Sequence, residues 1–274
     1  MSSDSYSSAP SKPFSDDGGE PKPQYFAALN YFFEQPDWGN SLLFGSLCML
    51  IPVVNNLILF GYRYEIVEMK VRFPDQQYPK FEFNRFSQYI TRGVWPFLID
   101  FIVQFLINIP IQITAWIAIG LVNAAGESES RLLVVVAGVG IPLLILAVLV
   151  FLILLNVVLV PILLRAGLAQ EFGQAFNVSW IKDFLGKVGL QTLVFYLFLF
   201  AVGTVLGLAG YLACCIGVIP VMFFLMGPVL AHIHWQLYRL YLAKGGEPIP
   251  LKPLQMAPAY SPPLSDTFPP KPPM

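Results

Sequence analysis

The stretch that decides the fold runs from 131 to 164, RLLVVVAGVGIPLLILAVLVFLILLNVVLVPILL, and Arg131 is its only charged residue. At about 1.5 Å of rise per residue, about 20 helical residues cross a hydrocarbon core of about 30 Å. Three other stretches are nearly as apolar. The chain is 56% hydrophobic and 12% charged, whereas charged residues make up about 25% of soluble domains. These features predict an integral membrane protein.

Hydropathy predicts an all-α, polytopic transmembrane helix bundle of about five spans with additional interfacial amphipathic helices. The spans are expected at residues 41–64, 95–122, 132–164, 188–212 and 215–242. In the fourth span Gly203, Gly207 and Gly210 recur at helical spacing, a pattern that lets another helix approach closely. We therefore interpret these glycines as a helix-packing face.

The first of these spans has a second interpretation. Its middle, residues 51–56, reads IPVVNN, and a proline followed by two asparagines is also typical of the tip of a re-entrant hairpin. A full crossing gives five spans and places the N-terminus outside the cell. A re-entrant hairpin leaves both chain ends in the cytoplasm.

Basic residues indicate the orientation. The loops at 63–93 and 165–187 hold most of the lysines and arginines between the spans, whereas Arg131 lies beside Glu127 and Glu129. By the positive-inside rule both basic loops and the C-terminus are cytoplasmic. Helical spans place the protein in the plasma or inner membrane, because proteins of the bacterial outer membrane are built from alternating strands.

Four regions follow from composition. Residues 1–21 are a polar tail without enough apolar surface to fold, and 245–274 are a Pro-rich cytoplasmic tail expected to be disordered. Between them, 22–37 is predicted to be an interfacial amphipathic helix, because its aromatic residues recur at helical spacing. Residues 38–244 form the transmembrane helical domain.

A second set of aromatic residues, at four-residue steps, lies in the loop at 165–187. Such spacing aligns side chains along one side of a helix, so this loop is predicted to contain an interfacial helix with its rings in the lipid. The interfacial aromatic residues are Phe172, Phe176, Trp180 and Phe184.

The most specific polar pattern lies in the second span, where Asp100, Gln104, Asn108 and Gln112 follow one another at four-residue steps. They form an intramembrane polar face, which must meet protein or water because lipid cannot satisfy it. The functional interpretation is a polar pathway or a bound headgroup. The structural interpretation, which we favour, is hydrogen bonding between helices, worth about 0.6 kcal/mol per bond.

Catalytic and metal-binding patterns are weak. His232 and His234 are two residues apart, so on a helix they point about 200° from each other and cannot hold one metal ion together. The sequence contains no nucleotide-binding or hydrolase motif. We therefore predict no catalytic residues, no metal and no cofactor. Nucleic acid is not an expected partner, because basic residues are dispersed among acidic ones.

Several short stretches between residues 36 and 245 together carry a family resemblance. They are Trp38, Asn40, 42–45, 51–53, Gly61, Tyr62, 73–79, 86–93, Phe97, Ala175, Phe176, Trp180, 215–217, Ala231, His232 and 236–238. These stretches resemble an uncharacterised prokaryotic family, the domain of unknown function 4013. The resemblance implies a polytopic membrane protein without an established activity, and it supplies no catalytic residue.

The expected function is a non-catalytic structural, assembly or lipid-organising role, with membrane lipids as partners and other membrane proteins or a second copy as further candidates. The alternative is a transporter or channel subunit that uses the polar face of Asp100 to Gln112. A lipid-modifying enzyme has the least support, because no nucleophile with an adjacent base can be named.

Overall fold

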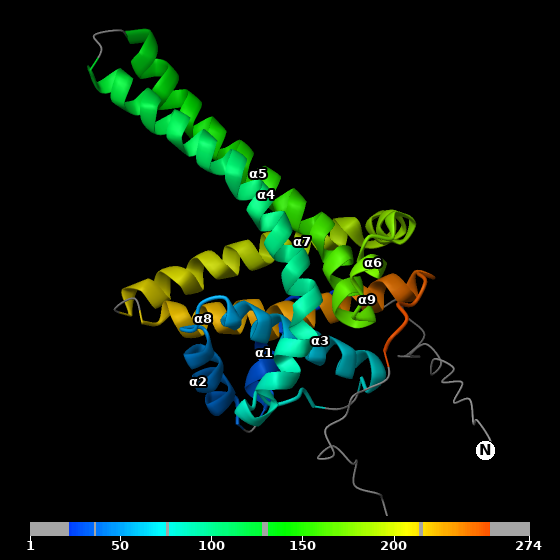
Figure 1. The fold of residues 1–274 in the computed structure, drawn as a ribbon. Coiled ribbons are helices and arrows are strands. Elements are labelled where there is room, and N and C mark those ends of the chain that lie inside the picture. Colours follow the sequence, from blue (N-terminus) through cyan, green and yellow to red (C-terminus); the bar gives the residue numbers. More distant parts are fainter. Residues whose placement is uncertain (1–21, 36, 75–76, 128–130, 214–215, 253–274) are drawn as a thin grey trace, which may run out of the picture.

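The computed structural model describes residues 22–35, 37–74, 77–127, 131–213 and 216–252, and over these the chain is entirely helical apart from its connections. Two long helical hairpins extend from a shared base and diverge (Figure 1). The first hairpin pairs α4 (Phe86–Glu127) with α5 (Arg131–Ala169). The second pairs α7 (Val178–Leu212) with a last helix that runs through α8 (Val218–Phe224), the π-helical turn η3 (Leu225–Val229) and α9 (Leu230–Ala243).

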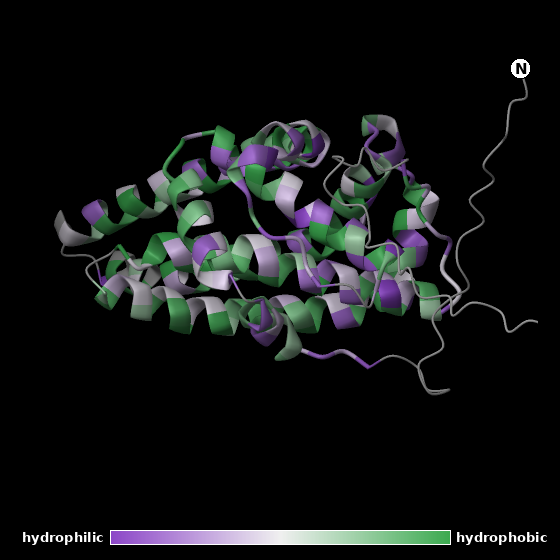
Figure 2. Cartoon of the chain, turned by 90° about the horizontal axis from the view of Figure 1, so that it is seen from below, coloured by the Kyte–Doolittle hydropathy of each residue, from purple (hydrophilic) through white to green (hydrophobic). Residues whose placement is uncertain are grey.

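Shorter elements build the base. They are α1 (Ala27–Asn30), η1 (Tyr31–Glu34), α2 (Trp38–Cys48), α3 (Val54–Arg72), η2 (Phe83–Arg85) and α6 (Phe172–Ala175). Hydrophobic residues run along the helices of both hairpins (Figure 2).

Four helical segments of the described chain are long and apolar enough to cross a membrane: Phe83–Gly126, Ala137–Ala169, Val178–Leu212 and Val218–Ala243. They confirm the predicted helical membrane class and correspond to the last four predicted spans. Their surroundings differ. In the last segment 61% of the most apolar window is buried inside the protein, against 0% in the first, so the last helix packs mainly against protein.

The predicted first span, 41–64, is wrong as a single helix. It is divided between α2 and α3, which are separated by a tight turn in which the N–H of Val54 donates to the carbonyl of Pro52 at 2.7 Å. Val53, between them, has φ 65°, a conformation that β-branched residues rarely adopt. The break favours the re-entrant interpretation, in which Pro52 and the asparagines after it mark a tip.

Helix α3 lies in the centre of the base, and every residue from Ile58 to Glu68 is buried. It crosses α4 where both helices carry glycine. A Cβ added to Gly61 would lie 1.9 Å from the carbonyl oxygen of Tyr89, and one added to Gly93 would lie 1.9 Å from that of Leu57. The two backbones can approach this closely only because neither position has a side chain.

The first hairpin extends well beyond the base. Along α4 the last buried residue is Ile107, and about 20 residues follow it, a length of about 30 Å in a helix. This length equals one bilayer crossing. Large apolar side chains on this part are exposed, with Trp116 at 70% and Ile113 at 55%.

The N-terminal region differs from the amphipathic helix predicted for 22–37. It contains only the short turns α1 and η1, and Ala28, Tyr31 and Phe32 are buried against the last helix and its neighbours. Residues 1–21 lie outside the described part of the chain.

The prediction of a disordered C-terminal tail is wrong for its first residues. Residues 245–252 pack across α7 and α9. Here Ile249 is buried and its N–H donates to the Tyr238 hydroxyl at 2.8 Å, while the Trp180 indole donates to the Glu247 carbonyl at 2.9 Å. Aromatic hydroxyl and indole groups hold this backbone, so its proline content did not prevent ordering. Residues 253–274 lie outside the described part.

Candidate functional site: a polar cluster inside the helix bundle

The predicted polar face on α4 is divided by its surroundings. Asp100 and Gln104 are partly buried at the base, where their side chains are hydrogen-bonded to each other. Asn108 and Gln112 lie on the extended part of α4 and are exposed. The Asn108 side chain donates to the carbonyl of Gln104 at 2.7 Å, within its own helix. The structure therefore does not bring the four residues together into one site.

Arg63 of α3 lies within electrostatic range of Asp100. It is buried, although its position in the sequence suggested a basic loop. Its guanidinium donates two hydrogen bonds to the carbonyl of Met226, one of them from Nε at 2.8 Å. Met226 belongs to η3, where Pro228 interrupts the regular helical ladder. The arginine thus satisfies a backbone carbonyl at a helix irregularity inside an apolar bundle.

Tyrosines and one histidine surround this arginine. Tyr64 and Tyr196 lie within its electrostatic range, and the Tyr64 hydroxyl is 3.5 Å from Nδ1 of His234. The other ring nitrogen of His234, Nε2, is buried and has no hydrogen-bond partner among the described residues. We call Arg63, Asp100, Tyr64, Tyr196 and His234 the polar cluster.

His232 faces a different set of partners. Its ring stacks on Tyr31 with centroids 4.5 Å apart, and its Nδ1 is hydrogen-bonded to the Tyr78 hydroxyl. The Tyr31 hydroxyl in turn donates to the carbonyl of Pro228, and burial raises the pKa of Tyr31 well above its usual value. The two histidines therefore have separate environments, and no group of three or more metal-ligating residues occurs within the described residues.

Sequence reasoning missed a second group of charges, between α3 and α4. Glu65 pairs with Arg85, and Glu68 pairs with both Arg92 and Arg72, the last at 2.8 Å. Both carboxylates are buried. The signal was present, since two acids three residues apart precede a loop rich in arginine. Their pairing stabilises the α3–α4 contact.

The predicted interfacial aromatic residues separate into two pairs. Phe172 and Phe176 are exposed and meet edge to face, 5.2 Å apart. Trp180 and Phe184 are buried and pack on Tyr241. The change of direction occurs at Asn177, which caps α7 by accepting a hydrogen bond from the N–H of Trp180 at 3.1 Å. Trp180 and Phe184 are therefore in the protein core and not in the lipid.

The predicted packing glycines have unequal surroundings. A Cβ on Gly210 would lie 2.9 Å from the backbone of Gly217, so Gly210 is needed where α7 approaches α8. Gly203 is in ordinary van der Waals reach of Leu225, and Gly207 has nothing within 4 Å.

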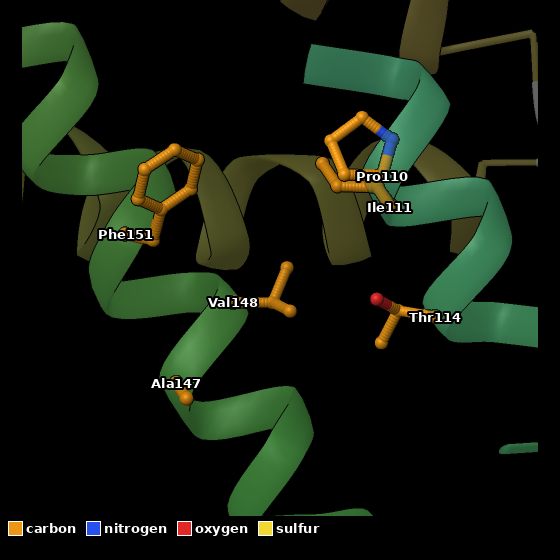
Figure 3. A pocket seen from close by; sticks show the side chains of 6 residues that line it. All are labelled: Pro110, Ile111, Thr114, Ala147, Val148 and Phe151. Carbon is orange, nitrogen blue, oxygen red and sulfur yellow. The ribbon is translucent and has the colours of Figure 1, made fainter. Parts of the chain in front are cut away.

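A groove lies between α4 and α5 on the extended hairpin (Figure 3). It has a volume of about 280 Å³ and is lined by apolar side chains and one hydroxyl, those of Pro110, Ile111, Thr114, Ala147, Val148 and Phe151. Such a lining suits an acyl chain or a hydrophobic side chain and offers no set of ligands for an ion.

Residues 44–216 match the family described as protein of unknown function (DUF4013). This is more than half of the chain. The chain belongs to the DUF4013 family. No curated protein and no solved structure matches it. The matched region spans Arg63 and Asp100 of the polar cluster, the whole first hairpin and the whole of α7.

Proposed function

We propose that this DUF4013 protein is a non-catalytic component of the plasma or inner membrane that organises lipids and neighbouring membrane proteins. The observation that carries the proposal is the first hairpin, which extends about one bilayer thickness beyond the base with apolar side chains outward. Further support comes from the charged groups of the base. The buried carboxylates of Glu65 and Glu68 are paired with arginines, an arrangement expected of a scaffold.

The proposed orientation places both described chain ends in the cytoplasm. Gln24 and Ile249 are hydrogen-bonded to Gln236 and Tyr238, which lie two residues apart along α9. The N-terminal region also contacts the basic loop, through the ion pair of Asp37 and Lys80. Since the positive-inside rule makes that loop cytoplasmic, the tip of the first hairpin faces the opposite side.

The exposed ring pair Phe172 and Phe176 is proposed to insert into the cytoplasmic leaflet. Purified protein in liposomes at high density should change lipid order and vesicle curvature, as reported by an environment-sensitive membrane dye and by electron microscopy. The double variant Phe172→Ser and Phe176→Ser should lose most of this effect. Val178→Ser is the matched control, because Val178 is exposed nearby and lies outside the ring pair. Unchanged lipid order and curvature with the parent protein would contradict the proposal.

A transporter or channel subunit is the second candidate, and the observation that favours it is the polar cluster. Ionisable residues inside a membrane bundle frequently mark transport pathways, and Asp100 lies within electrostatic range of Arg63. Asp100→Asn in proteoliposomes should then alter solute flux or its pH dependence. Equal flux in parent and variant over a broad solute panel would exclude this candidate.

A further inference from the structure

One exposed face of α4 has the spacing of a helix-packing seam. Its members alternate steps of four and three residues and are exposed, and two amide side chains distinguish it from the other exposed stripes of α4. We call them the α4 seam: Phe101, Phe105, Asn108, Gln112, Ala115, Ile119 and Val122. Alternating steps of this kind keep a stripe of side chains facing one partner helix along its whole length.

The described part of this chain leaves the seam uncovered. The side of α4 that faces α5 carries residues that are buried or partly buried, among them Ile107, Ile111 and Thr114. Because each residue turns the helix by about 100°, the centre of the seam lies about 115° around the helix axis from the side that faces α5. The described residues therefore supply no partner for the seam.

The two amide side chains at the centre of the α4 seam, Asn108 and Gln112, indicate which partner the seam is suited to. In the described part of the chain, Gln112 makes no side-chain hydrogen bond, and Asn108 uses only its N–H group, within its own helix. Asn108 lies at the base end of the crossing, whereas Gln112 lies about 6 Å further in, at about 1.5 Å per residue, where lipid offers neither donors nor acceptors to an amide. An amide carries both a donor and an acceptor, so it is complementary to a second copy of itself across a two-fold axis.

We propose that the α4 seam is the contact surface for a second copy of this chain, with Asn108 and Gln112 hydrogen-bonded across the pair. Polar side chains at core positions of paired helices fix register and copy number, which gives the amides a role that apolar residues would not fill. Ala115 lets the helices approach closely in the distal half. This inference deepens the proposed function and rests on it for one point only, that α4 crosses the membrane.

Disulfide cross-linking in native membranes tests the seam. In a background with Cys48, Cys214 and Cys215 replaced by alanine, Ala115→Cys places a thiol in the seam. Ile113→Cys is the matched control, since Ile113 is exposed at almost the same depth but lies about 130° from the centre of the seam. Mild oxidation should give a covalent dimer with Ala115→Cys and little with Ile113→Cys. Equal cross-linking at both positions, or cross-linking at Ile113 alone, would overturn the proposal.

The amides are tested in the same background. Adding Asn108→Leu or Gln112→Leu to Ala115→Cys should lower the dimer fraction at limiting protein density by about threefold for each amide, as expected for interhelical hydrogen bonds in membranes. An unchanged dimer fraction would refute the role of the amides.

Photobleaching of singly labelled protein in dilute liposomes provides a readout independent of disulfide geometry. Two-step bleaching is expected for the parent and mainly single-step bleaching for the double leucine variant. Single-step bleaching of the parent would overturn the proposal that the seam pairs two copies. A separate measurement then tests the hairpin: if Gly126→Cys, at the end of α4, still reacts from outside the cell, the first hairpin crosses the membrane as proposed and only the pairing is refuted.

Discussion

The side chain of Gln236 in α9 makes two hydrogen bonds with the backbone of Gln24, accepting from its N–H at 2.8 Å and donating to its carbonyl at 2.9 Å. One glutamine thereby pairs with an otherwise unpaired backbone segment in the way that a neighbouring strand would. The contact joins the beginning of the described chain to its last helix, and residues 245–252 pack on the same helix.

Replacing this glutamine should release the N-terminal region. Gln236→Leu removes both hydrogen bonds and should lower the free energy of unfolding by about 2 kcal/mol, at about 1 kcal/mol per bond. Thermal unfolding in detergent and limited proteolysis near residue 24 would measure it. Gln77→Leu is the control, because Gln77 is exposed. Equal protease resistance in both variants would show that Gln236 does not hold the segment.

Two glycine-to-alanine variants, one at the crossing of α3 and α4 and one away from it, should differ in stability. Gly61→Ala places a methyl group 1.9 Å from the carbonyl oxygen of Tyr89, so the helices must separate, at a cost of about 1–3 kcal/mol or more. Gly120→Ala, in α4 with nothing within 4 Å of the added atom, should be neutral or stabilising by up to about 1 kcal/mol. Melting temperatures in detergent compare the two. A Gly61→Ala protein as stable as the Gly120→Ala protein would contradict the close crossing.

Hydropathy was sufficient to predict the helical membrane class and four of the long helices, because span length and apolar composition are local properties of the sequence. The break at Val53 was present in the sequence as Pro52 and two asparagines, but their position within an apolar stretch allowed a crossing as well as a turn. Contacts between distant residues resolve this ambiguity: α3 is surrounded by protein, and charges such as Arg63 are acceptable there because they have partners.

The candidate site was predictable only in part. The four-residue spacing of Asp100 to Gln112 identified a polar face, but periodicity contains no information on how far the base extends along α4. Asp100 and Gln104 lie within the base and are partly buried, whereas Asn108 and Gln112 lie beyond it and are exposed. Equally, the roles of Trp180 and Phe184 depend on a turn at Asn177, which rotates the start of α7 toward Tyr241.

The turn at Val53 should be strained. Its φ of 65° costs a β-branched residue about 1–2 kcal/mol, and glycine adopts it without that cost. Val53 is 62% exposed, so little packing is lost on truncation. Val53→Gly should therefore raise the stability by about 1 kcal/mol, measured by thermal unfolding in detergent micelles. Val54→Gly serves as the control: Val54 is the first residue of α3 and its partly buried side chain packs against the core, so its loss should be destabilising. A loss of stability of similar size in Val53→Gly would argue against the strained turn.

Breaking a buried ion pair should lower the stability far more than breaking an exposed one. Glu68→Gln leaves Arg72 and Arg92 without their carboxylate in a buried position, and breaking such a pair costs about 3–5 kcal/mol. Asp37→Asn breaks the exposed pair with Lys80 and should leave stability unchanged. Chemical denaturation of both variants in the same micelle would measure the difference. Similar stabilities would mean that the α3–α4 charges do not act as a buried network.

The central claim is that the first hairpin crosses the membrane once in each direction while both ends of the described chain stay in the cytoplasm. Single cysteines at Lys22, Gly126 and Lys252, in a background without native cysteines, test it by reaction with an impermeant maleimide in intact cells. Labelling at position 126 alone, with positions 22 and 252 reacting only after permeabilisation, is the predicted result. Labelling at position 22 in intact cells would contradict the account and restore the five-span topology.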